Sequence, residues 1–282
     1  MNGMSELETI EHLRRRVPAV HGELVLGIGD DCAIYRPRGA REDLLLTTDL
    51  MVEGVHFRRE ETSPAFIGHK SLARGLSDIA AMGGEPKLCL VSLAFPKTWA
   101  RHVDEFYRGL LRLARQTGTQ VAGGDLSSAN RIVIDIIVCG AVAKGMALRR
   151  DGAKPGEAIY VSGALGLSAK RGYRLLPVPR LELGRSLRGR ASACMDLSDC
   201  LSIDLYRMCE ASGVSARLDH VPVATGATLE HALHGGEDYE LLYTGPAGLP
   251  GIMIGRVVGL DPAALITLRD EPLLPKGYDH FS

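Results

Sequence analysis

The chain has 282 residues, with 33 lysines and arginines against 34 aspartates and glutamates, for a net charge of −1. This balance provides no overall positive field to attract nucleic acid or an anionic membrane, and the 45% hydrophobic content is ordinary for a globular protein of one or two domains. The six cysteines have no CxxC spacing, which argues against a disulfide framework or a zinc site, and no apolar run is long enough to span a membrane. We therefore expect a reduced, cytoplasmic protein.

The first half of the chain is predicted to alternate strands and helices. Ser5 and Glu8 have capping-box spacing, and Ser63 with Pro64 is typical of a helix start. The expected segments are a helix over 5–16, strands within 23–29, 32–37 and 43–57, a helix over 63–84, a strand over 87–95, a helix over 98–118 and a strand over 131–143. This order indicates an α+β or mixed-sheet domain.

A change in composition marks the middle of the chain. Residues 144–157 are rich in Gly, Lys and Arg, so we place a domain boundary there, between 1–145 and 146–282. In the second half, strands are expected within 158–163, 239–244 and 251–259, and a helix after "MDLSD".

Acidic residues recur beside Gly, Ser or Thr throughout the chain. Any single one is explained as a turn former or a helix cap, but several stand inside apolar runs. Asp78 is the sharpest case, because it lies late in its predicted helix, where no cap is needed and Asp is a poor helix former. The set comprises Asp30, Asp31, Asp49, Asp78, Asp125, Asp196, Asp199, Glu237 and Asp238.

Converging carboxylates are stable only if cations neutralise them, and oxygen ligands without a His/Cys cluster favour Mg²⁺ over Zn²⁺. Such a Mg²⁺ site usually serves a phosphate substrate, and the glycines of "AGGDLSS" and "HGGED" would let backbone approach phosphates. No P-loop motif, Rossmann fingerprint or protein-kinase motif set is present. The sequence therefore predicts phosphate chemistry on another scaffold.

An ordered series of motifs covers about residues 27 to 281. It runs "GIGDDCAI", "TTDLMVEGVHF", "LSDIAAMGGEP", "VAGGDLS", "LRRDGAKPGEAIYVSG", "MDLSDCLSIDL", "GGEDYELLYT" and "GYDHF". In this order the motifs resemble the thiamine-monophosphate kinase family, within the aminoimidazole-ribonucleotide-synthetase-like superfamily. Single motifs are weak, but the ordered series is specific.

The resemblance implies an α/β (α+β) fold of two domains: an N-terminal domain for ATP, Mg²⁺ and dimerisation, and a C-terminal domain that completes the cleft. It implies a homodimer in which the N-terminal sheets form a shared barrel. It also implies ATP-dependent phosphorylation of thiamine monophosphate to thiamine diphosphate with several Mg²⁺ ions, and no nucleic-acid or membrane partner.

The resemblance also implies a role for individual residues. The implied metal ligands are Asp30, Thr48, Asp49, Asp78, Asp125, Asp196 and Asp199, with a further contact from Thr47. The implied ATP-binding residues are Tyr107, Gly124, Asp125, Arg150 and Ser198. His56, Glu237 and Tyr278 fall where the family holds the thiamine part, and an aromatic ring at Tyr278 suits a cationic thiazolium. Arg149 is the alternative phosphate contact, with Arg150 preferred by motif position.

The implied reaction is direct in-line transfer, without a phosphoenzyme or a general base. A donor with about four negative charges meets an acceptor with about two, so metal ions are needed to bring them together. The adjacent carboxylates Asp30 and Asp31 then have a reason to be there, because Asp30 and its partners would hold these ions.

The sequence departs from the family pattern at three positions. Cys32 follows "GDD" where the family has Ala, Gly75 precedes "LSD" where it has Asn, and Cys200 follows "SD" where it has Gly. The second half also looks shortened, which bears on substrate specificity. Two alternatives remain: another ATP-using enzyme of the superfamily, or a non-catalytic nucleotide-binding regulator.

Overall fold

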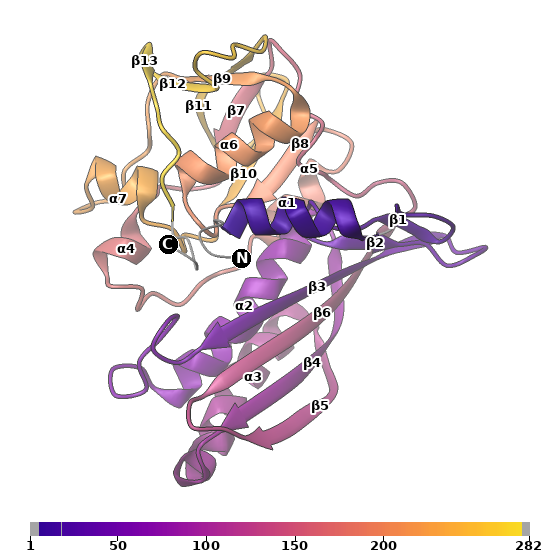
Figure 1. Ribbon diagram of the computed structural model, residues 1–282, viewed down its shortest axis with the longest axis vertical. Coiled ribbons are helices and arrows are strands. Elements are labelled where there is room, and N and C mark those ends of the chain that lie inside the picture. Colours follow the sequence, from indigo (N-terminus) through magenta and orange to yellow (C-terminus); the bar gives the residue numbers. More distant parts are fainter. Residues whose placement is uncertain (1–5, 18, 278–282) are drawn as a thin grey trace.

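The computed structural model describes residues 6–17 and 19–277 and contains two β-sheets, one in each half of the chain (Figure 1). Across the first sheet the strands are β1 (Leu24–Leu26), β2 (Ala33–Tyr35), β3 (Glu42–Val52), β6 (Val133–Ala143), β4 (Glu85–Phe95) and β5 (Gln120–Ser128). Across the second they are β13 (Glu271–Pro272), β12 (Ile266–Leu268), β9 (Ser215–Leu218), β11 (Ile252–Val258), β7 (Ala158–Val161), β10 (Leu241–Gly245) and β8 (Ala193–Asp196).

Strands β3 and β6 form the long centre of the first sheet. They pair antiparallel along their whole length, from Glu42 opposite Ala143 to Val52 opposite Val133. Because side chains alternate along a strand, consecutive residues of β3 face opposite sides of the sheet. This period of two separates Thr47 from its neighbour Thr48.

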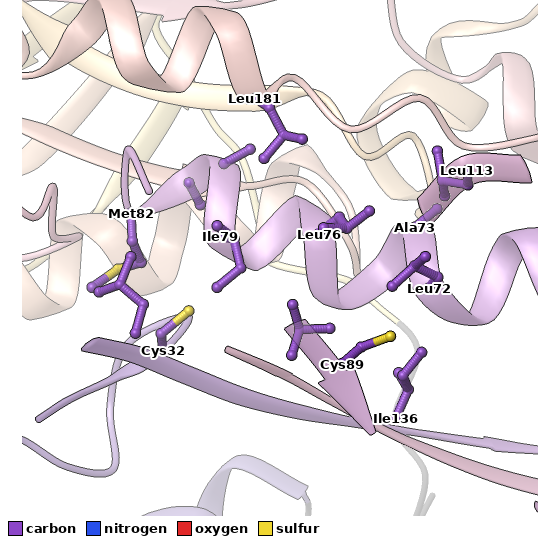
Figure 2. Close-up of a cluster of buried hydrophobic side chains, with 14 of the residues drawn as sticks. Cys32, Leu72, Ala73, Leu76, Ile79, Met82, Cys89, Leu113, Ile136 and Leu181 are labelled. Carbon is purple, nitrogen blue, oxygen red and sulfur yellow. The ribbon is translucent and has the colours of Figure 1, made fainter. Parts of the chain in front are cut away.

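Helix α2 (Pro64–Ala81) lies on one face of the first sheet and also contacts β8 and helix α5 (Leu181–Leu187) of the second half. The Ser63 hydroxyl accepts a hydrogen bond from the Phe66 N–H at 3.2 Å, so the predicted helix start is confirmed. Most of its 18 residues are buried. Figure 2 places Ile136 and Cys89 of the first sheet on one side of α2 and Leu181 of α5 on the other.

Helix α3 (Val103–Thr117), preceded by the 3-10 helix η1 (Lys97–His102), packs against α2 at two glycines. A Cβ on Gly68 would lie 2.0 Å from the Phe106 carbonyl oxygen, and one on Gly109 would lie 1.8 Å from that of Ala65. The two backbones therefore touch, which fixes the position of α2 over the sheet.

The second sheet carries shorter helices and shares part of its core with the first half. These helices are α4 (Leu167–Lys170), α5, α6 (Leu201–Ser212) and α7 (Leu229–His234), while α1 (Glu6–Arg16) belongs to the first half. Tyr160, Leu187 and Tyr243 belong to the same buried cluster as α2. Burial of such side chains contributes about 1.5–3 kcal/mol each, so α2 stabilises both halves at once.

Most predicted elements are confirmed, with two instructive differences. The segment "GIGDD" is a turn between β1 and β2 rather than part of a strand, and β5 was not predicted at all. Adjacent glycines lower the strand propensity of β5, yet Gly124 is required there because its Cβ would lie 1.9 Å from the Val91 carbonyl oxygen. Parallel pairing with β4 thus overrides local propensity.

The cysteines and the hydropathy agree with expectation. All six cysteines are free, and five of them are buried. Within residues 6–17 and 19–277, no helix combines the length and apolar character needed to cross a membrane.

Candidate functional site

A group of carboxylates from both halves of the chain gathers at one end of α2. We call Asp30, Asp31, Asp49, Asp78 and Asp196 the carboxylate cluster. They come from the turn before β2, from β3, from α2 and from the end of β8. The negative charges of Asp49, Asp196 and Asp31 all act on Asp78, which indicates that the group occupies one region.

The two adjacent aspartates of the first turn are paired with Arg150. The Arg150 guanidinium donates to Asp31 at 2.6 Å and its Nε lies 3.5 Å from Asp30, while the Arg150 backbone N–H donates to Asp30 at 3.2 Å. Burial and the neighbouring Asp31 raise the pKa of Asp30 to about 7, despite Arg150. One oxygen of Asp31, Oδ2, is buried without a hydrogen-bond partner.

Asp78 lies in the last turn of α2, facing β3. It accepts a hydrogen bond from the Thr47 hydroxyl at 2.5 Å. Burial, and then the charges of Asp49 and Asp196, raise the pKa of Asp78 well above its usual value. Its position late in a buried helix is therefore explained by tertiary contacts rather than by capping.

Asp196 brings the second half of the chain into the cluster. It ends β8, is 2% exposed and accepts a hydrogen bond from the Ser77 hydroxyl of α2 at 2.6 Å. Burial and the charge of Asp31 raise its pKa well above the usual range. Five carboxylates thus stand against two guanidinium groups in direct contact, those of Arg150 and Arg74. The deficit of positive charge suits a cationic ligand.

The loop after β8 adjoins the cluster and carries Asp199. Arg207 of α6 donates to Asp199 at 2.5 Å and to Asp204 at 2.9 Å. Cys200 has φ of +154°, a conformation that favours glycine. The family pattern of Gly after "SD" therefore has a backbone reason, and Cys200 bears the strain of replacing it.

Glu237 and His56 are brought together by Lys70 of α2. The buried Lys70 ammonium donates to Glu237 at 2.6 Å and to the His56 carbonyl at 3.2 Å. The His56 ring nitrogen Nδ1 accepts a hydrogen bond from the Val52 N–H at 3.0 Å, so Nδ1 stabilises the turn in which His56 lies. Glu237 has φ of +55°, and its N–H donates to the Ser198 carbonyl at 2.7 Å. This strained position ties Glu237 to the loop beside the cluster.

Asp238, next to Glu237, has a structural partner instead. Its carboxylate accepts from the Gly166 N–H at 2.7 Å and the Ser168 N–H at 3.4 Å, at the start of α4. Burial raises its pKa to about 6. Asp238 therefore holds the short α4 segment against the 235–240 loop.

Four of the expected site residues lie away from the carboxylate cluster in the structure. Thr48 is on the opposite face of β3 from Thr47 and donates to Asp135 at 2.6 Å. Gly124 and Asp125 are on the edge strand β5, three strands from β3, which is about 14 Å at ordinary strand spacing. Tyr107 packs into the core beside Phe106, with ring centroids 5.4 Å apart. Tyr278 lies outside the described residues.

The side chains of Arg149 and Arg150 lie in different environments. Arg150 faces the carboxylate cluster, whereas Arg149 pairs with Asp151 and lines a separate cavity of about 290 Å³ beside Gly189 and Ser192. Of the two, only Arg150 contacts Asp30 and Asp31 in the described part of the chain.

Sequence reasoning missed the two cations of α2 that face the site. Lys70 forms an ion pair with Glu237, and Arg74 forms one with Asp49 at 2.9 Å. A usable signal existed, because Lys70, Arg74 and Asp78 recur every four residues in an otherwise apolar helix. Asp204 and Arg207 on α6 were missed as well, since their spacing looks like an ordinary surface pair.

Comparisons with known proteins identify a family with similar sequences and a similar fold. Residues 29–142 match the family described as AIR synthase related protein, N-terminal domain. The thiamine-monophosphate kinase of Bacillus subtilis (strain 168) is 34% identical, over 99% of this chain and 100% of its own length. That of Rhodopirellula baltica is 36% identical, over 92% of each.

A solved structure extends the likeness to three dimensions. The AaThiL complex with AMPPCP and TMP superposes with a TM-score of 0.89 at 30% identity, and the match covers 98% of this chain and 97% of that one. The α/β (α+β) fold implied by the resemblance is thereby confirmed. By full-length sequence identity and by fold, this chain belongs to the thiamine-monophosphate kinase family of phosphotransferases.

Proposed function

We propose that this protein transfers the γ-phosphate of ATP to thiamine monophosphate and so forms thiamine diphosphate, in the cytoplasm. The observation that carries the proposal is the convergence of Asp30, Asp49, Asp78 and Asp196 from both halves of a chain whose relatives bear this activity by name. ATP and thiamine monophosphate match the ligands named for the similar AaThiL structure. The free cysteines fit a reducing compartment.

The donor set of the cluster fits Mg²⁺. Its groups are carboxylate oxygens, which Mg²⁺ prefers, and one buried oxygen, Asp31 Oδ2, has no hydrogen-bond partner. In the described part of the chain no three His, Cys, Asp or Glu side chains are arranged to hold a metal ion. The cluster carboxylates are instead held by Arg150, Thr47 and Ser77. Asp30, Asp49, Asp78 and Asp196 would hold Mg²⁺, with Asp199 and Thr47 beside them.

Bound Mg²⁺ would neutralise the phosphate charges of donor and acceptor. The residues of the chain then act by position. Arg150 and Ser198 lie beside the cluster, where the ATP phosphates would bind. Glu237, His56 and Tyr278 would hold the thiamine part. The acceptor phosphate is largely ionised at neutral pH, so we propose direct in-line transfer without a general base.

We further propose a homodimer built from the outer face of the first sheet, and a domain boundary near residue 145. Large apolar side chains are exposed on this face, including Leu50 at 52% and Leu46 at 38%, which share a face of β3 with Thr48. Thr48 and Asp125, expected at the site, are on this face or its edge strand rather than with the cluster. A second subunit would bring its Tyr107, Gly124 and Asp125 toward the ATP of the first.

The activity is tested by incubating the protein with ATP, Mg²⁺ and thiamine monophosphate and measuring thiamine diphosphate and ADP. Formation of both in equal amounts is expected. Tight ATP binding without turnover would instead indicate a non-catalytic regulator. Turnover only with a different acceptor would point to another enzyme of the superfamily.

Sharing of the site between subunits is tested by mixing two inactive variants, Asp78→Asn and Asp125→Asn. If Asp125 acts on the partner's site, half of the mixed dimers are hetero-dimers with one intact site each. Activity should then return to about a quarter of the wild-type value after subunit exchange. If Asp125 acts within its own chain, the mixture stays inactive.

A further inference from the structure

Helix α2 presents a row of charged side chains toward the site. Lys70, Arg74 and Asp78 are four residues apart, so they lie along one face of the helix. At 1.5 Å per residue the row spans about 12 Å. It leads from Glu237, which pairs with Lys70, to the carboxylate cluster at Asp78.

Arg74, in the middle of this row, has unused hydrogen-bonding capacity. One nitrogen, Nη2, lies 2.9 Å from Asp49, while Nε and Nη1 are buried without a partner. A guanidinium has five N–H donors, and unpaired buried donors are costly. The neighbouring Lys70 differs, because its ammonium has both Glu237 and the His56 carbonyl as acceptors.

The surroundings of Arg74 favour an anionic ligand that lies between Lys70 and Asp78, the two ends of the row. Arg74 is a cation, because a guanidinium is not deprotonated in proteins, and its ion pair with Asp49 engages only Nη2. A guanidinium matches the oxygens of a phosphate in a paired geometry that Lys70 cannot provide. No described protein group accepts a hydrogen bond from Nε or Nη1 of Arg74, so its paired geometry is not used within the protein.

We propose that Arg74 binds the phosphate of the acceptor substrate. The inference rests on the proposed function: with the organic part of the acceptor at Glu237 and the transferred group at the carboxylate cluster, the acceptor phosphate must lie between them, beside Arg74. Its Nε and Nη1 are shielded from solvent here, so binding requires the guanidinium to turn from Asp49 toward the ligand. Arg74 then sets the preference for a phosphorylated acceptor.

The test compares the affinities of thiamine monophosphate and thiamine, which differ only by the phosphate, using calorimetry in Mg²⁺ buffer without nucleotide. The wild type should bind the monophosphate more tightly. Arg74→Met should weaken monophosphate binding by about ten- to a hundredfold, the range expected for hydrogen bonds to a charged group, with thiamine affinity changed less than about twofold. Arg74→Lys keeps the charge but loses the paired geometry, so its affinity for thiamine monophosphate should lie between those of the wild type and Arg74→Met.

Arg108→Met on α3 is the matched control, because Arg108 is an exposed arginine that pairs only with Glu105 among its described ion pairs, and it should behave as wild type. Circular dichroism and thermal unfolding establish that each variant is folded. If Arg74→Met does not fold, Arg74→Lys decides the matter, with a raised KM for thiamine monophosphate and an unchanged KM for ATP expected.

Two results separate this inference from the proposed function. A wild type that forms thiamine diphosphate, together with folded Arg74 variants that keep the full preference for the monophosphate, would mean that Arg74 only balances the charge of Asp49, and the inference would be wrong. A wild type that forms no thiamine diphosphate would overturn the proposed function, and the inference with it.

Discussion

The two faces of the first sheet carry aspartates in opposite circumstances. On the inner face, Asp49 of β3 points toward α2, where Asp78 of that helix is buried among like charges. On the outer side, Asp125 is exposed on the edge strand, and Asp135 accepts a hydrogen bond from Thr48. The residue type is the same on both sides.

The difference teaches that strand register, not residue type, decides which carboxylate meets which partner. Thr47 and Thr48 are adjacent, yet one donates to Asp78 inside and the other to Asp135 outside. The inner face crowds negative charge that needs a cation, whereas the outer face exposes leucines that need a covering surface. We therefore propose a metal ion at the inner face and a second subunit at the outer face.

The largest effect is expected from Asp78→Asn, which tests the role of the inner face. It removes one negative charge from the cluster at nearly constant volume, so the fold should remain while turnover falls by at least about a hundredfold. Steady-state production of thiamine diphosphate measures the effect, and circular dichroism checks the fold. Near-normal turnover would mean that Asp78 has only a structural role.

The outer face is tested by Leu50→Glu, which places a charge on the exposed apolar surface of β3. Burying that charge in an interface is costly, so we expect the dissociation constant of the proposed dimer to rise at least about a hundredfold. Sedimentation velocity measures the association. Glu60→Lys, at an exposed position outside the sheet, is the control and should leave it unchanged. A Leu50→Glu variant that dimerises normally would place the interface elsewhere.

The stabilisation of the protein by Mg²⁺ should depend on the inner face of the first sheet and not on its outer face. Mg²⁺ at a hundred times its dissociation constant adds about 2.7 kcal/mol to the free energy of unfolding of a protein that binds it only when folded. Asp78→Asn should lose most of this gain, and Asp135→Asn should keep it. Thermal unfolding with EDTA and with Mg²⁺ provides the measurement, and equal responses of the two variants would contradict the assignment of the metal to the inner face.

The smallest expected effect concerns Cys200, beside the inner cluster. Its φ of +154° is strained for any residue but glycine, and Cys200→Gly relieves that strain at the loss of one small buried side chain. We expect the free energy of unfolding to rise by about 1 kcal/mol. Urea denaturation measures it. A fall of similar size would show that the hydrogen bond from the Cys200 thiol to the Lys276 carbonyl matters more than the strain.

Much of the fold could be predicted because its signals are local. The start of α2 at Ser63 and Pro64 and the end of α3 at Gly118 follow from capping rules and were recovered. Strand β5 could not be recovered, because Gly124 is required there by close contact with β4, which no local pattern records.

The sequence by itself determined the residue types of the site: a set of aspartates in apolar surroundings, without His/Cys partners, from which we infer a hard cation and phosphate substrates. Only the tertiary structure decided which of them meet. Asp78 and Asp196, 118 residues apart, converge because α2 packs against both β3 and β8, while Asp125 stays three strands away. The physical reason is that residue type sets what a side chain can bind, but packing and strand register set its neighbours.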